Sequence, residues 1–183
     1  MLHKKIIMID NNVIEGKGLV ATELIKKDEV VYRLDPNEPT YSIADVLMMT
    51  PEEQEKLTNF TYQCREDIIT DVQGDDRYMN HSCDPNTTWL DDDTLIASRD
   101  ILPGEEVTYD YATADITLPF TMECHCGSPN CRKVVTNLDY RDPVWQAKYG
   151  NMLPQHTLKA IAQWNASIVI ENRPEPIQPT YTT

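Results

Sequence analysis

The sequence predicts a mainly β domain built of several small sheets, with helices confined to one insert and to the C-terminal part. The chain has 183 residues, 40% of them hydrophobic and 25% charged, as in one ordinary globular domain. Short apolar and β-branched runs recur between Gly, Pro, Asn and Asp, at residues 2–9, 18–21, 29–34, 94–98 and 106–109. Short strands at close spacing with turn residues between them are typical of small sheets.

Helical patterns interrupt and follow these strands. Thr50 precedes a proline and two glutamates, which together supply an N-cap, a first-turn proline and an acidic first turn. We therefore expect a helical insert at about residues 45–62. Two further helical patterns cover about 142–149 and 154–164, and the prolines that follow them indicate a mobile tail over 171–183.

Charge and hydropathy exclude two classes of partner. The chain carries 30 acidic and 16 basic residues, a net charge of −14, so a nucleic-acid backbone is not an expected partner. No run approaches the roughly 20 apolar residues of a membrane span, and no secretory signal is visible.

Residues 71–123 hold 13 acids and two arginines, a net of −11. This acidic segment is either a solvated face or a field that attracts a cationic substrate.

The cysteine pattern favours a metal site. Three of the five cysteines lie within eight residues: Cys124, Cys126 and Cys131. An odd number of cysteines and a CxC unit do not favour disulfide bonds, so we expect the cysteines to bind zinc. Reduced thiols of this kind indicate a reducing compartment, the cytoplasm or the nucleus. Unliganded thiols are the alternative. Four thiolates would make a closed, structural zinc site. Spacing alone leaves Cys83, His125 and Cys64 as candidates for the fourth ligand, and Cys64 is more typical of a buried apolar residue.

Three other segments combine glycines, polar groups and aromatic hydroxyls. In Gly16-Lys17-Gly18 the two glycines allow a backbone to approach a ligand closely, but the third glycine and the helix of a dinucleotide-binding fingerprint are missing. The second segment is Asn80-His81-Ser82-Cys83-Asp84-Pro85-Asn86, and the third is Gly104-Glu105-Glu106-Val107-Thr108-Tyr109-Asp110-Tyr111. Each segment taken singly is ambiguous.

Taken in order, GxG, N-H-S-C-x-P-N, G-E-E-x-T-Y-D-Y and C-x-C-x4-C resemble the SET-domain protein lysine methyltransferases that carry a post-SET zinc-binding segment. The resemblance covers about residues 3–135, and the ordered combination is highly specific. It implies a SET domain of small sheets with a pseudoknot at 3–118 and a post-SET zinc segment at 119–135. Residues 136–170 look like the helical C-terminal extension of small stand-alone microbial SET proteins.

The resemblance also implies S-adenosyl-L-methionine and Zn²⁺ as cofactors. The family's pocket for S-adenosyl-L-methionine corresponds here to Glu15, Gly16, Lys17, Gly18, Arg77, Tyr78, Asn80, His81 and Tyr111. The family's zinc set corresponds to Cys83, Cys124, Cys126 and Cys131. The large residue that often packs on the adenine after the last zinc cysteine is absent, so Val134, Val135 or the later helices are expected in its place.

Two tyrosines carry the implied chemistry. Tyr111 matches the catalytic tyrosine, whose hydroxyl orients the lysine amine for in-line displacement. Tyr109 falls at the position where tyrosine restricts the number of methyl groups, which predicts mono- or dimethylation. A sulfonium and a water-poor channel both lower the pKa of the lysine, so no dedicated protein base is required. Tyr32, Phe60 and Tyr62 are candidates for the wall of the channel, although ordinary core is the expectation for each.

The resemblance thus implies an S-adenosylmethionine-dependent protein-lysine N-methyltransferase that acts on a basic protein, with histones, histone-like and ribosomal proteins as candidates. One alternative is a catalytically silent SET fold that serves as a binding module or scaffold. The joint presence of Asn80, His81 and Tyr111 argues against it. A zinc-ribbon nucleic-acid binder is a further alternative, opposed by the net charge of −14.

Overall fold

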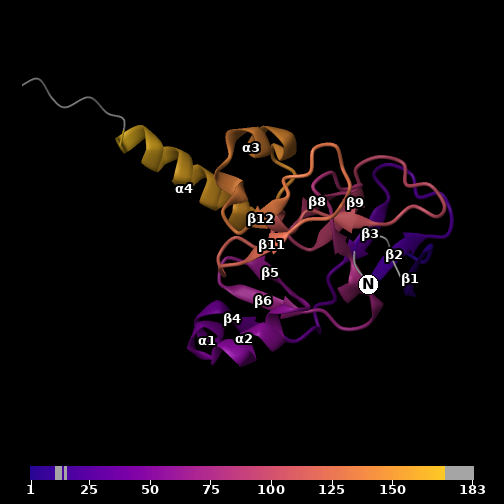
Figure 1. The fold of residues 1–183 in the computed structure, drawn as a ribbon, viewed down its shortest axis with the longest axis horizontal. Coiled ribbons are helices and arrows are strands. Elements are labelled where there is room, and N and C mark those ends of the chain that lie inside the picture. The colour runs from indigo at the N-terminus through magenta and orange to yellow at the C-terminus, as the bar shows by residue number, and fades with distance from the viewer. Residues whose placement is uncertain (11–13, 15, 172–183) are drawn as a thin grey trace, which may run out of the picture.

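A computed structural model describes residues 1–10, 14 and 16–171 (Figure 1). The strands are β1 (Ile6–Asp10), β2 (Lys17–Ala21), β3 (Val30–Arg33), β4 (Thr40–Ser42), β5 (Thr61–Arg65), β6 (Ile68–Asp71), β7 (Asn80–His81), β8 (Thr87–Asp91), β9 (Thr94–Ala97), β10 (Thr108–Tyr109), β11 (Thr121–Glu123) and β12 (Val134–Thr136). The helices are α1 (Ile43–Met48), α2 (Pro51–Thr58), α3 (Pro143–Tyr149) and α4 (Gln155–Glu171), with 3₁₀ turns η1 (Asp75–Tyr78), η2 (Tyr111–Thr113) and η3 (Asp139–Arg141). The predicted mainly β architecture is confirmed.

The strands form several small sheets. β1 and β2 make a hairpin, β3-β9-β8 and β4-β6-β5 are three-stranded antiparallel sheets, and β11 pairs with β12. β7 and β10 pair in parallel, with Thr108 opposite Asn80 and Tyr109 opposite His81. This parallel pair places the Asn80–Asn86 and Gly104–Tyr111 segments side by side.

Several strands lie outside the runs that the sequence predicts. β4, β5, β6 and β8 contain polar residues that apolar patterning passes over. In β5 the side chain of Gln63 is buried: its amide nitrogen donates to the carbonyl oxygens of Arg65 and Glu66 at 3.0 and 3.1 Å, and its amide oxygen accepts from the distant segment after Asp115. Internal hydrogen bonds of this kind let a polar residue occupy a buried strand. The predicted strand at 2–9 begins only at Ile6, and Leu2 forms an isolated bridge with Tyr32.

The insert between β4 and β5 contains two short helices, α1 and α2, where the sequence predicts one. Ser42 caps α1, and its side chain accepts a hydrogen bond from the Asp45 amide. Thr50 caps α2 in a reciprocal capping box with Glu53, as the Thr-Pro-Glu-Glu pattern predicts. Both helices therefore begin at residues whose side chains satisfy free amide groups.

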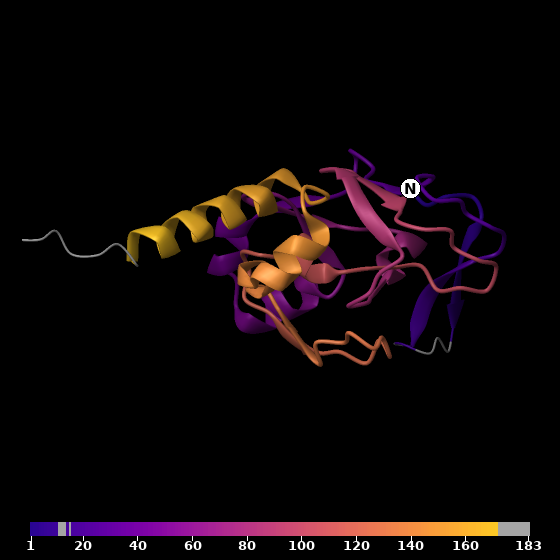
Figure 2. The same ribbon diagram turned by 90° about the horizontal axis from the view of Figure 1, so that it is seen from above.

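Three apolar clusters form the core of the described structure, and the smallest of them lies between α1 and β6. The larger cluster surrounds Leu19, Val31 and Trp89 in the strand region, and the second contains Val135, Trp145 and other residues near β11, β12 and α3. The predicted helix at 142–149 is confirmed as α3, and the one at 154–164 continues further, as α4. Figures 1 and 2 show α4 leaving the body of the domain from a start near α3. The predicted tail lies outside the described residues, apart from Glu171 at the end of α4.

Candidate active site and metal centre

Tyr109 and Tyr111 lie together where β10 ends and η2 begins. Their ring centroids are 4.8 Å apart. The Tyr111 hydroxyl donates to the carbonyl oxygen of Met79 at 3.0 Å, and its backbone amide donates to Nδ1 of His81 at 3.2 Å. The tyrosine that the sequence predicts to be catalytic is thus held at both ends by the segment around β7. These two hydrogen bonds therefore fix the position and orientation of Tyr111.

A cavity of about 380 Å³ adjoins these tyrosines. Consecutive ring contacts along it join Tyr32 to Tyr62, Tyr62 to Trp89, and Trp89 to Tyr109, with centroid separations of 6.4, 5.9 and 6.3 Å. Tyr32, Tyr62 and Phe60, for which the sequence predicts ordinary core, all line it. Tyr32 and Tyr62 are buried in the larger cluster as well, so the same side chains serve as core and as cavity wall. Aromatic rings therefore form much of the cavity wall.

The predicted cofactor-binding residues come together from two strands. Asn80 of β7 donates through Nδ2 to the carbonyl oxygen of Lys17 and to Oε1 of Glu106, both at 2.8 Å. Gly16 has a φ of +28°, and a Cβ built on it would meet no atom within 4 Å, so the backbone there borders open space. Gly18 is buried in β2. A backbone that faces open space next to polar side chains fits the end of a small polar ligand.

Other predicted pocket residues lie at the junction of this region and the cavity. The ammonium of Lys17 is 4.8 Å from the centroid of the Tyr78 ring, and Tyr78 packs edge-on against Phe60 at 5.8 Å. Arg77 lies over Phe60 at 3.9 Å and lines the cavity. Glu15, also predicted to contact the cofactor, lies outside the described residues.

The two valines expected near the adenine have different environments. Val134 is 48% exposed, whereas Val135 is fully buried in the cluster of α3. Val135 therefore packs inside the protein, and of these two valines it is Val134 that exposes apolar surface. Chain geometry separates them because neighbouring residues of a strand point to opposite faces.

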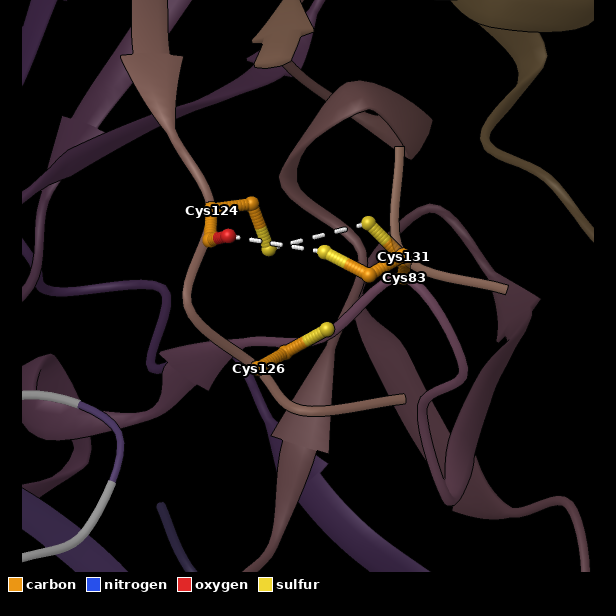
Figure 3. A group of neighbouring side chains, drawn as sticks. All are labelled: Cys83, Cys124, Cys126 and Cys131. Carbon is orange, nitrogen blue, oxygen red and sulfur yellow. Dashed lines mark hydrogen bonds between the residues drawn. The ribbon is translucent and has the colours of Figure 1, made fainter. Parts of the chain in front are cut away.

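Four cysteine side chains converge in one place (Figure 3). The Sγ atoms of Cys83, Cys124, Cys126 and Cys131 all lie within 4.8 Å of one another, and those of Cys83 and Cys124 are 3.7 Å apart. Tetrahedral zinc with Zn–S bonds of about 2.3 Å requires sulfur atoms roughly 3.8 Å apart. The donor set and its spacing therefore fit a four-thiolate zinc ion.

The rivals for the fourth ligand lie elsewhere. Cys64 belongs to β5, where its thiol contacts the carbonyl oxygen of Ile68 at 3.6 Å. The side chain of His125 is 70% exposed and is 3.9 Å from Glu123. Among the described residues only Cys83 joins the three late cysteines. Spacing could not make this choice, because Cys83 is 41 residues from Cys124.

Cys83 also contacts the predicted active site. Nε2 of His81 is 3.4 Å from its sulfur, and the backbone amide of Arg132 donates to the same sulfur at 3.3 Å. Burial lowers the pKa of His81 to about 4, so the ring is neutral near pH 7. Since Nδ1 accepts from the Tyr111 amide, the ring proton resides on Nε2 and faces the thiol. One imidazole thus links the cysteine cluster to Tyr111.

Asp110 is a buried carboxylate between the two tyrosines. It accepts hydrogen bonds from the guanidinium of Arg132, from Nε1 of Trp145 at 3.2 Å and from the hydroxyl of Tyr149 at 2.7 Å. Burial alone would raise its pKa, but the bonds and charge of Arg132 bring that pKa below the ordinary value. The sequence interpretation assigned Asp110 no role, because nothing local shows that an aspartate between tyrosines is buried.

Most of the acidic segment faces solvent. Of the 13 acids in residues 71–123, Asp110 is the one that is buried, and the others are partly or fully exposed. Asp115 is half-buried and lines the cavity.

In the part of the chain that the structure describes, no helix has the length and apolar character to cross a bilayer.

Comparison with known proteins supports the same fold. Residues 16–112, more than half of the chain, match the SET domain family. Histone-lysine N-methyltransferase 2D of Homo sapiens is 32% identical over 130 residues, which is 66% of this chain and 2% of that protein. The chain therefore spans a small part of the length of this curated relative.

Two solved structures resemble the fold. The methyltransferase domain of human Histone-lysine N-methyltransferase SETMAR aligns with a TM-score of 0.54 and 21% identity over 72% of this chain and 58% of that chain. KRYPTONITE in complex with mCHG DNA and SAH aligns with a TM-score of 0.51 and 23% identity, over 67% of this chain and 27% of that one. The family match over residues 16–112 and this shared architecture agree, and the chain belongs to the SET-domain family.

Proposed function

We propose that this protein transfers a methyl group from S-adenosyl-L-methionine to a lysine side chain of a basic protein. The observation that carries the proposal is the position of Tyr111, which lines the aromatic cavity while both its amide and its hydroxyl are held by the β7 segment. A phenol oxygen that donates its proton to the Met79 carbonyl can still accept a hydrogen bond from an amine. Tyr111 would therefore hold the lysine nitrogen in a fixed orientation.

The cavity suits the aliphatic stem of a lysine. Aromatic rings, including Tyr32, Tyr62 and Trp89, form much of its wall, and they attract a cation over their faces. Tyr109 narrows the same cavity beside Tyr111. A hydroxyl at that point leaves less room for added methyl groups, so the expected products are mono- and dimethyllysine.

S-adenosyl-L-methionine would be held by the GxG turn and by Asn80, His81, Arg77 and Tyr78. The open space beside Gly16 and the polar cluster of Asn80 and Glu106 fit its amino-acid end. When bound, it supplies an electrophilic methyl group on a positively charged sulfur. The KRYPTONITE structure was solved with SAH, which supports the same class of ligand for a fold of this kind.

Zinc is proposed as the ion held by the four cysteines. Four thiolates leave no open coordination position, so the ion would be structural. It would hold the 124–131 loop against Cys83 and, through His81, against the Tyr111 amide. Free thiols in this arrangement favour a reducing compartment, the cytoplasm or the nucleus.

The substrate is proposed to be a basic protein, with histones, histone-like and ribosomal proteins as candidates. The exposed acids of residues 71–123 would attract positively charged segments around a target lysine. The curated relative 2D is named a histone-lysine methyltransferase, which supports a histone as the first candidate. The net charge of −14 argues against direct binding of nucleic acid.

The decisive experiment is methyl transfer from radiolabelled S-adenosyl-L-methionine to core histones and to basic chromosomal and ribosomal proteins. Wild type is compared with Tyr111→Phe and with Tyr41→Phe, a matched control in β4 whose side chain does not itself line the cavity. We expect lysine labelling that falls about 100-fold in Tyr111→Phe, because the amine loses its orientation. The control should retain wild-type activity.

The result can also contradict the proposal. If wild type binds zinc and S-adenosyl-L-methionine but labels no lysine on any of these proteins, the proposed transfer to histones and to basic chromosomal and ribosomal proteins is contradicted, and a narrower substrate or a silent SET-fold binding module takes its place. If Tyr111→Phe labels lysine as fast as wild type, the assignment of Tyr111 is wrong. Mass spectrometry of labelled peptides identifies the lysine and counts its methyl groups.

A further inference from the structure

Asp115 places a carboxylate in the wall of the same cavity that Tyr109 and Tyr111 line. Its backbone amide donates to the carbonyl oxygen of Tyr111 at 3.0 Å, which closes one helical turn. Residues four apart on such a turn project from the same face. Tyr111 and Asp115 therefore share the cavity for a structural reason.

The position of Asp115 is fixed by the buried residue Gln63. The backbone amide of Gln63 donates a hydrogen bond to Oδ1 of Asp115 at 2.7 Å. Its side-chain oxygen accepts from the amides of Ile116 and Thr117 at 3.2 and 3.0 Å. These three bonds hold the segment after Asp115 against β5, so the carboxylate keeps a defined place in the cavity wall.

The carboxylate has no counter-charge of its own. Within the described residues Asp115 forms no ion pair, and Arg77, the basic side chain in the cavity lining, is 3.7 Å from Asp71. The titratable groups on the elements around Asp115 are Tyr32, Tyr62, Cys64, Asp76, Arg77, Tyr109, Tyr111 and His156. An acid without a counter-charge in an aromatic cavity is a site for a cation that arrives from outside.

We propose that Asp115 binds the substrate lysine as its ammonium form and accepts a proton from it. This inference rests on the proposed lysine methyltransferase function and adds a proton acceptor to it, in place of the expectation from the sequence that no protein base is required. An N–H bond of the ammonium breaks, its electron pair stays on nitrogen, and the proton forms an O–H bond on Asp115. The nitrogen lone pair then becomes the nucleophile, and the proton later leaves through the open end of the cavity to water.

Other groups in the cavity are poorly matched to this role. Burial raises the pKa of Tyr32, Tyr62 and Tyr109, so these phenols keep their protons near neutral pH and cannot accept another. Burial raises the pKa of the Asp115 carboxyl to about 7, against a smaller lowering by the Gln63 amide. A carboxylate with this pKa is ionised at pH 8 and is a stronger proton acceptor than an ordinary aspartate.

The pH profile of kcat/KM for a lysine peptide tests the proposal. For wild type we expect a loss below about pH 7, where Asp115 is protonated, and a plateau above it. Asp115→Asn keeps the Gln63 bond but cannot accept a proton, so its kcat/KM should be about 100-fold lower at pH 7.5. Its rate should then rise about tenfold per pH unit toward the ordinary lysine pKa of about 10.4. Asp91→Asn, an exposed acid outside the cavity, should follow wild type.

A less basic amine provides a second readout. In a peptide with S-aminoethylcysteine in place of the lysine, the amine loses its proton more easily. The ratio of wild-type to Asp115→Asn activity should therefore be smaller than with lysine. If the two enzymes have parallel pH profiles and equal ratios for both peptides, Asp115 is not the proton acceptor.

Binding of n-butylammonium tests the site without any methyl transfer. At pH 8 we expect about tenfold weaker binding to Asp115→Asn than to wild type, followed by the fluorescence of Trp89 and by chemical shifts. Binding of n-butanol should be equal in both. Equal affinity for n-butylammonium would overturn the proposal, and this result is independent of whether the protein labels any lysine. Failure of methyl transfer with selective butylammonium binding would instead contradict only the proposed function.

Discussion

The carboxylate of Asp110 accepts two hydrogen bonds from the guanidinium of Arg132, at 2.7 and 2.6 Å. Asp110 lies between the two tyrosines of the proposed active site, and Arg132 directly follows the last cysteine of the cluster. The same carboxylate accepts from Tyr149 of α3. Three sequence regions that are distant in the chain are thus joined at one buried charge, next to the tyrosine that is proposed to orient the substrate.

Loss of Arg132 should destabilise the fold strongly. Arg132→Met leaves the Asp110 carboxylate buried without its counter-charge, which costs about 3–5 kcal/mol of unfolding free energy. Arg65→Met is the matched control, because Arg65 pairs with Asp93 where both side chains are 43% exposed, and its loss should cost about 0–1 kcal/mol. Urea denaturation at pH 7.5 measures both values. Equal stability of the two variants would contradict a structural role for the Asp110–Arg132 pair.

Removal of one cysteine ligand should release zinc. Cys83→Ser leaves three thiolates, so zinc retention against a chelator should fall by at least about 100-fold, and the thermal midpoint should fall with it. Cys64→Ser changes a thiol of β5 that is not part of the cluster and should keep one zinc per chain. Elemental analysis of the purified proteins gives the metal content. Zinc loss from both variants, or from neither, would be inconsistent with the proposed ligand set.

The hydroxyl of Tyr109 should limit the number of methyl groups. Tyr109→Phe removes an oxygen from the cavity wall beside Tyr111, which leaves more room around a methylated nitrogen. The product should therefore shift from mono- and dimethyllysine toward trimethyllysine, as resolved by mass spectrometry. Tyr41→Phe should give the wild-type distribution. An unchanged distribution in Tyr109→Phe would show that another part of the cavity sets the product.

The Asp115 carboxyl should make the fold less stable at neutral and alkaline pH than at pH 4. Its pKa is about 7 in the fold against 3.8 for an ordinary aspartate, so the unfolded chain ionises first and stability falls as pH rises from about 4 to 7. This difference corresponds to roughly 4 kcal/mol as an upper value. Asp115→Asn has no such charge and should unfold at higher urea concentration than wild type at pH 8. The gap should close toward pH 4, and a gap that is independent of pH would contradict this origin.

The local sequence determined much of this protein. The order of the GxG, N-H-S-C, Y-D-Y and C-x-C motifs predicted the family, and the Thr50 capping pattern predicted the start of a helix that the structure places at Pro51. Such features are local, because a cap or a ligand spacing depends on residues that are neighbours in the chain. For the same reason the strand at β5 was missed, since the burial of Gln63 depends on bonds with the segment after Asp115.

Only the tertiary structure decided which residues meet. Tyr32 and Tyr62 have the pattern of ordinary strand residues, and their place in the wall of a cavity beside Tyr111 follows from the packing of three sheets. Likewise Asp110 and Arg132 are 22 residues apart, and neither spacing nor composition indicates that they share a buried ion pair. The sequence determines which chemical groups are present. Contacts between distant segments determine the burial of each group, its partners and therefore its pKa.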